Sequence, residues 1–242
     1  MTREYLHVSR KTARVAGVLY LLLVLTGLFN LMYTPGKLIV RGNAAETANK
    51  ILAHQTLFRI DLVIGLLSTV IFIFLVLVLY RLLKEVNQQH AVLMVILVLV
   101  QIPQSFLSQL LQIGAFELVR GADFLSVLDK SQRDVLAMLC FHLNDLGTYL
   151  SEMFWGLWLF PLGLLVYRSG FLPRTLGVWL IINGFAYVGM SLTGLLLPDY
   201  SDAIYKIAFP ALLGEMAFML WLLIMGVRPK PLTDYAQVPA GG

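Results

Sequence analysis

Six long apolar stretches alternate along the chain with short polar segments. Each is close to or longer than the roughly 20 residues with which an α-helix crosses the hydrocarbon core of a bilayer. They lie near 12–34, 57–80, 90–117, 135–167, 174–197 and 203–227. We therefore predict an all-α polytopic membrane protein, in which residues 1–228 form one six-helix transmembrane bundle. Residues 229–242 are polar and rich in Pro and Gly, which predicts a flexible tail.

The composition agrees with the membrane assignment. Hydrophobic residues make up 59% and charged residues 13% of the 242 residues, with a mean hydropathy of +0.80, whereas soluble proteins have about 45–50% and 25%. The net charge of +4 does not indicate nucleic-acid binding, because the cations are spread between the apolar stretches. The single cysteine, Cys140, has no partner for an intramolecular disulfide or a C-x-x-C motif.

Six spans place both ends of the bundle on one side of the membrane. Cytoplasmic loops carry an excess of Lys and Arg, and ten of the 18 cations adjoin the two ends and the loops of the same side. These ten are Arg3, Arg10, Lys11, Arg14, Arg81, Lys84, Arg168, Arg174, Arg228 and Lys230. We predict that both ends face the cytoplasm.

The opposite side carries a loop with a helix signal. In "GNAAETANKILAHQ", Asn43 is a candidate N-cap, with Glu46 three residues later and apolar residues beyond it. The segment therefore predicts a short interfacial helix. Ser131 is a candidate cap for the fourth transmembrane helix.

Four stretches resemble a known family. They are "ARVAGVLYLLLVLTGLF", "KLIVRGNAAETANKILAHQTLFRI", "VYRSGFLPRTLGVWLIINGFAYV" and "FPALLGEMAFMLWLLIMGV". Together they are similar to the bacterial membrane family named domain of unknown function 4386, over roughly residues 12–228. The resemblance implies a protein of the bacterial cytoplasmic (inner) membrane, and it assigns no catalytic role to any residue.

The fourth span carries unusual polar residues in "FHLNDLGTYLSEMFWGLW". Ionisable side chains at bilayer depth are costly and mark candidate functional sites. At 100° per residue, His142, Asp145, Tyr149 and Glu152 fall within one helix face about 80° wide. We predict that they share one wall of a polar pocket.

The third span supplies a second polar face. Its stripe, about 100° wide, consists of Gln101, Gln104, Ser105, Ser108 and Gln112. Such a stripe has to face other helices or a wet cavity, because lipid cannot pair with amides. Pro103 beside it removes one backbone donor.

Asp61 in the second span and Glu215 in the sixth complete the predicted site. We expect Asp61 to pair with Arg59 or with the fourth helix, and Glu215 to lie near the middle of the bilayer. The second, third, fourth and sixth helices would then enclose an acidic pocket that opens outward. Its excess negative charge requires protonated carboxyls, a bound metal or organic cation, or water.

Three hypotheses about function follow. In the first, the pocket binds a small ligand, lipid headgroup or cation in a transport, sensing or accessory role; its residues are Asp61, Gln101, Gln104, His142, Asp145, Tyr149, Glu152 and Glu215. In the second, His142, Asp145 and Glu152 serve an intramembrane enzyme such as a metal-dependent hydrolase. In the third, the polar groups only join helices in a membrane scaffold.

The sequence does not decide between these hypotheses, although it favours a binding protein over an enzyme. It contains no G-x-S-x-G, H-E-x-x-H, G-x-G-x-x-G or Walker A motif, so we predict no cofactor and no metal site. Expected partners are the lipid bilayer and a small ligand or cation, and a membrane-protein partner or a second copy of the chain stays open. The glycines Gly177, Gly184, Gly189 and Gly194 are expected to let the fifth span approach its neighbours closely.

Overall fold

A computed structural model describes residues 2–227 of the chain, and side chains from residue 10 onward. The predicted tail over 229–242 lies outside the described residues, as do Arg228 and Lys230 of the topology count. All regular elements of the described part are helical. They are α1 Thr2–Leu28, the π-helix η1 Phe29–Tyr33, α2 Thr34–Leu38, α3 Ala44–Ala53, α4 Gln55–Leu83, α5 Gln88–Val100, α6 Ile102–Arg120, η2 Asp123–Leu125, α7 Lys130–Leu157, α8 Leu159–Arg168, α9 Arg174–Leu196, η3 Pro198–Tyr200 and α10 Ser201–Ile224.

The described residues form six helical spans that are long and apolar enough to cross a membrane, which confirms the predicted fold class. Two of the predicted spans are each divided into two helices. The third is interrupted at Gln101, between α5 and α6, and the fourth at Trp158, between α7 and α8. Pro103 and Pro161 follow these breaks within three residues, and a proline cannot donate the backbone hydrogen bond of a continuous helix.

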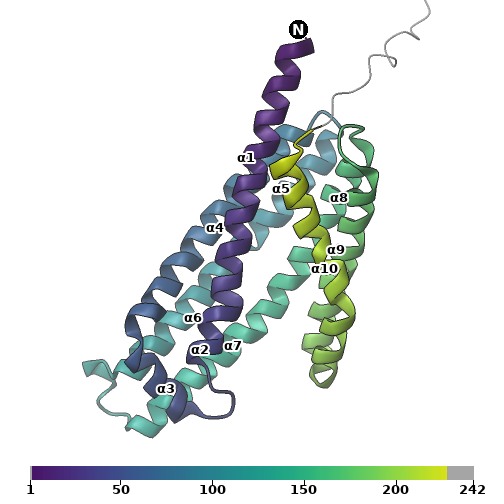
Figure 1. The fold of residues 1–242 in the computed structure, drawn as a ribbon. Helices are drawn as coiled ribbons and strands as arrows, with labels where there is room; N and C mark the ends of the chain where they lie inside the picture. Colours follow the sequence, from purple (N-terminus) through teal and green to yellow (C-terminus); the bar gives the residue numbers. More distant parts are fainter. Residues whose placement is uncertain (1, 228–242) are drawn as a thin grey trace, which may run out of the picture.

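The six spans are arranged as a ring. Helix α1 packs between α4 and α10, α9 packs against α10, α7 and α8, and α6 packs against α7. Helices α4 and α5 close the ring through their contacts with each other and with α6 and α8. Figure 1 shows that α1 begins and α10 ends at the same end of the bundle, here called the terminal end, whereas α3 lies at the opposite loop end.

Two separate hydrophobic cores hold the ring together. The terminal-end core includes Tyr20, Leu75, Met94, Trp158 and Phe218, all at most 2% exposed. The loop-end core is smaller and is formed by residues such as Leu38, Ile51, Phe58, Phe116 and Phe141. Because the two cores do not merge, the middle of the bundle is free to hold a cavity.

The outer surface of the ring is apolar. Large side chains such as Leu25, Val63, Leu110 and Phe185 keep more than half of their surface exposed. In water such a surface would be an aggregation hazard. On helices of this length it indicates contact with the lipid bilayer, as the sequence predicted.

The loop-end helix α3 forms as the sequence predicted, but the cap of α7 differs. The Asn43 side chain accepts a hydrogen bond of 3.0 Å from the Glu46 backbone N–H. The prediction that Ser131 caps the fourth span is wrong. Asp129, which has an extended backbone, is the N-cap and forms a reciprocal capping box with Gln132, so Ser131 already lies inside the helix.

Small residues bring α9 against its neighbours. A Cβ atom on Gly177 would lie 2.7 Å from the Gly163 carbonyl oxygen, and one on Gly184 would lie 3.0 Å from that of Gly156. Gly194 faces the Tyr149 ring in the same way, but nothing lies within 4 Å of a Cβ at Gly189. The predicted close approach is therefore confirmed for three glycines and wrong for Gly189.

This difference provides a test of helix packing. Replacing Gly177 with Leu forces α8 and α9 apart, and overpacking of this kind costs about 1–3 kcal/mol. Gly189→Leu, in the same helix and with open space around it, is the matched control. Thermal unfolding in detergent should show a clearly lower midpoint for Gly177→Leu than for Gly189→Leu, and equal midpoints would contradict the packing described here.

Candidate functional site

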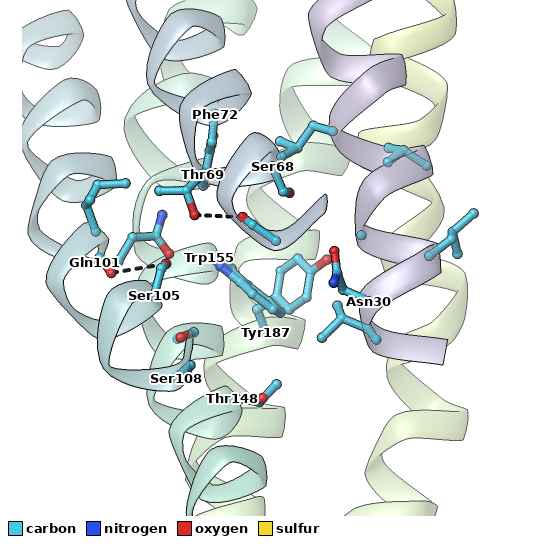
Figure 2. A pocket seen from close by; sticks show the side chains of 18 of the residues that line it. Asn30, Ser68, Thr69, Phe72, Gln101, Ser105, Ser108, Thr148, Trp155 and Tyr187 are labelled. Carbon is cyan, nitrogen blue, oxygen red and sulfur yellow. Dashed lines mark hydrogen bonds between the residues drawn. The ribbon is translucent and has the colours of Figure 1, made fainter. Parts of the chain in front are cut away.

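A cavity of about 430 Å³ lies between the two cores. Its wall is formed by residues of α1, η1, α4, α6, α7, α9 and α10, together with Gln101 between α5 and α6 and Trp158 between α7 and α8. Figure 2 shows Ser68, Thr69, Ser105, Trp155 and Tyr187 around this space. The sequence predicted that four spans, the second, third, fourth and sixth, line the pocket. In the structure, many residues of the first span line the cavity as well.

The polar stripe of the third span divides between the cavity and a helix contact. Gln101, Ser105, Ser108 and Gln112 line the cavity. The amide of Gln104 instead donates a hydrogen bond of 3.3 Å to the Gly147 carbonyl and so joins α6 to α7. Gln101 is 2% exposed, and its Nε2 is buried without a hydrogen-bond partner.

Helix α7 presents a different face to this cavity from the one the sequence suggested. Asn144, Thr148, Ser151 and Trp155 line it at intervals of three or four residues, which is one helix face. Sequence reasoning missed these residues because it gave weight to ionisable groups. A search for all amides and hydroxyls in the span would have found the first three.

The four α7 residues predicted from the sequence do not gather at one place. Asp145 and Tyr149 line a second cavity, and Asp145 interacts electrostatically with Arg41 and His142. His142 is exposed and lines neither cavity. Glu152 is 8% exposed, lines neither cavity, and its Oε2 has no hydrogen-bond partner.

The second cavity has a volume of about 520 Å³ and lies at the loop end. Residues of η1 and α2, Arg41, Asp61 and part of α7 form its wall. Five residues line both cavities, namely Asn30, Leu31, Gln112, Asn144 and Thr148. The two spaces therefore adjoin, and a polar path leads from the loop end toward the middle of the bundle.

Asp61 lies along this path and is only 4% exposed. The Asn30 amide donates to its carboxyl oxygen at 2.8 Å and to its backbone carbonyl at 2.9 Å. The predicted pairing with Arg59 or the fourth helix is wrong. The Arg59 guanidinium lies 5.6 Å from the centre of the Phe116 ring, where the attraction of a cation to an aromatic face holds it.

Glu215 lines the first cavity and joins three helices. The Tyr20 hydroxyl of α1 donates to its Oε1, and the Asn183 amide of α9 donates to its Oε2 at 3.4 Å. The Tyr187 hydroxyl also interacts with this carboxyl. Sequence reasoning missed these partners, although Asn183, an amide inside an apolar span, met the criterion applied to the glutamines.

The arrangement does not support the metal hydrolase hypothesis. His142 and Glu152 are ten residues apart on α7, which separates them by about 15 Å along the helix axis. In the described part of the chain, no three His, Cys, Asp or Glu side chains are placed to hold one metal ion.

The fold and the two cavities define a polytopic α-helical membrane protein with a polar interior. The chain belongs to the family described as domain of unknown function (DUF4386), which matches residues 15–226. An "Uncharacterized protein" of Archaeoglobus fulgidus is 32% identical over 124 residues, which are 51% of this chain and 67% of that protein. No solved structure matches the chain significantly.

The hydrogen bond between Tyr20 and Glu215 should stabilise the contact of α1 with α10. We expect Tyr20→Phe and Glu215→Leu, each of which removes one partner of this bond, to lower stability, with an interaction energy of about 0.5–2 kcal/mol between them, as for buried hydrogen bonds in membrane proteins. Unfolding of the two single variants and the double variant in detergent measures this coupling. Strictly additive effects would show that the bond contributes nothing.

Proposed function

We propose that this protein binds a small ligand inside the membrane, in the first cavity, and that this binding serves a transport, sensing or accessory role. The main support is the cavity of about 430 Å³ itself, which is lined by polar and aromatic side chains, among them Gln101, whose buried Nε2 has no hydrogen-bond partner. A buried unpaired donor costs about 1–3 kcal/mol. A ligand that accepts a hydrogen bond from Gln101 would offset this cost.

The size and lining of the cavity favour a small molecule. Ligand pockets typically have volumes of about 300–1,000 Å³ and combine apolar walls with a few polar groups. Here Phe72, Trp155 and Trp158 supply apolar surface, and Gln101 and Glu215 supply polar groups. Polar and apolar parts of one ligand would therefore both find partners.

A purely structural scaffold agrees less well with these contacts. It would require the polar groups of the interior to satisfy one another, as the Gln104 amide does with the Gly147 carbonyl. The Nε2 of Gln101 and the Oε2 of Glu152 are instead buried without a hydrogen-bond partner. Helix contacts in which all polar groups satisfy one another would not leave these two atoms unpaired.

We further infer a bacterial cytoplasmic membrane, with the terminal end of the bundle facing the cytoplasm. The resemblance to a bacterial membrane family supports the compartment, and the excess of Lys and Arg at the terminal end supports the orientation. The second cavity, at the loop end, would then face outward.

The orientation is tested by cysteine labelling in a Cys140→Ala background. Ser126 at the loop end and Glu85 at the terminal end are both exposed. We expect a membrane-impermeant maleimide to label Ser126→Cys on intact cells, and Glu85→Cys only after the cells are permeabilised, because the reagent cannot cross the bilayer. The reverse pattern would overturn the proposed orientation.

Ligand binding is tested by filling the cavity. Gly27 lines the first cavity, and a Cβ atom added to it would meet nothing within 4 Å; Gly114 has equally open surroundings but lines neither cavity. Native mass spectrometry of protein purified in mild detergent should show a retained small mass in the wild type and in Gly114→Phe. The mass should be lost in Gly27→Phe, because the phenyl ring occupies the binding space.

Two results would contradict the proposal. One is a wild-type protein that carries no additional mass. The other is a Gly27→Phe variant that retains the same mass as Gly114→Phe, since the ligand would then bind elsewhere.

A further inference from the structure

The geometry points to a lateral entrance from the bilayer, between α1 and α10, through which an amphiphile with an ammonium headgroup reaches Glu215. This inference rests on the proposed ligand-binding function and specifies the class of ligand and its route.

Helices α1 and α10 are fixed together only toward the terminal end of the entrance. A Cβ atom on Gly17 would lie 2.6 Å from the Leu223 backbone nitrogen, so the two backbones are almost in contact there. One turn further along α1, Tyr20 donates its hydrogen bond to Glu215. Beyond these contacts the helices diverge toward the loop end, and α7 is visible between them (Figure 1).

The first cavity continues into this divergence. Leu28 and Leu31 on one side, and Leu212 and Met216 on the other, line it. Leu28, Leu31 and Met216 keep 47%, 52% and 40% of their surface accessible. The wall of the cavity is therefore also part of the accessible surface of the bundle, at a height where the surrounding medium is lipid.

The chemistry of the wall changes from the entrance inward. The entrance is formed by Leu28, Leu31, Leu212 and Met216, which suit a hydrocarbon chain. The wall away from the entrance carries Gln101, Ser105 and Ser151, and Glu215 lies where α1 and α10 meet, beside the entrance. An amphiphile with its head inside and its chain in the entrance matches this gradient, whereas a fully polar solute would leave the entrance without a partner.

The charge of the wall selects the headgroup. Among the described residues that line the first cavity, Glu215 is the single carboxyl group, and none is Lys, Arg or His. A phosphate head would have no cation to pair with and would face a carboxyl group. An ammonium head would be attracted by Glu215 and by aromatic rings, since Trp155 and Tyr187 form one pair with centroids 5.9 Å apart, and Phe72 and Trp158 another at 5.2 Å.

Photolabelling in a bilayer tests the inference. The full chain is reconstituted into phosphatidylcholine nanodiscs with a dodecylammonium probe that carries a diazirine in its chain, or with the matching dodecyl phosphate probe. Only labelling that excess unlabelled dodecylammonium removes is counted, because any such probe also labels lipid-facing surface. We expect this saturable labelling at residues 27–31 and 212–216, and about fivefold more with the ammonium probe than with the phosphate probe.

Two leucines of α1 allow the entrance and the outer surface to be tested separately. Leu28 lines the cavity, whereas Leu25 is 54% exposed and lines neither cavity. Leu28→Trp should narrow the entrance and reduce saturable labelling at least several-fold, and Leu25→Trp should leave it unchanged. Glu215→Gln should remove the preference for the ammonium probe even where labelling persists.

The outcomes separate this inference from the proposed function. Equal saturable labelling by the two probes would overturn the ammonium headgroup, and equal labelling of Leu28→Trp and Leu25→Trp would overturn the lateral entrance. If ethylammonium, which has no long chain, competes as well as dodecylammonium, the amphiphile is overturned while the binding cavity stands. If no labelling is saturable and Gly27→Phe retains the same bound mass as the wild type, both the inference and the proposed function fail.

Discussion

A carboxyl group inside a bundle of apolar helices has to be surrounded by hydrogen-bond donors, and the environment of Glu215 meets this requirement. Its donors come from other helices, with Tyr20 on α1 and Asn183 on α9. Leaving such a group unpaired costs several kcal/mol. The register of α10 relative to both neighbours is therefore tied to one side chain, which is also part of the cavity wall.

The helices around α10 use close backbone contacts as well. Helices α8 and α9 approach each other through Gly163 and Gly177, and α1 approaches α10 through Gly17. Lipid provides little hydrophobic drive for such contacts, so close backbone packing supplies van der Waals attraction instead. At Gly27, α1 has no such contact, and the open space of the first cavity adjoins the helix there.

The positions of polar groups also separate the hypotheses about function. Shared catalysis by His142, Asp145 and Glu152 would require these side chains to meet, but His142 is exposed and Glu152 is buried about 15 Å further along the helix. The cavity instead collects uncharged amides and hydroxyls, such as Gln101, Ser105 and Asn144, around one carboxyl group. Under the proposed function, such a lining orients a ligand by hydrogen bonds.

The order of amino acids was enough to predict the six spans, the loop-end helix with its Asn43 cap, and the third-span stripe that includes Gln101 and Gln112. These follow from local rules, because hydrophobic length and helical periodicity act within one segment. The face of α7 that meets the cavity emerged only from the packed helices, and it is turned by about 110° from the predicted one. The rotation of a helix and the partners of Asp61 and Glu215 depend on side chains from distant spans, such as Asn30 and Tyr20. A single helix does not encode its orientation in a ring, since packing against its neighbours sets it.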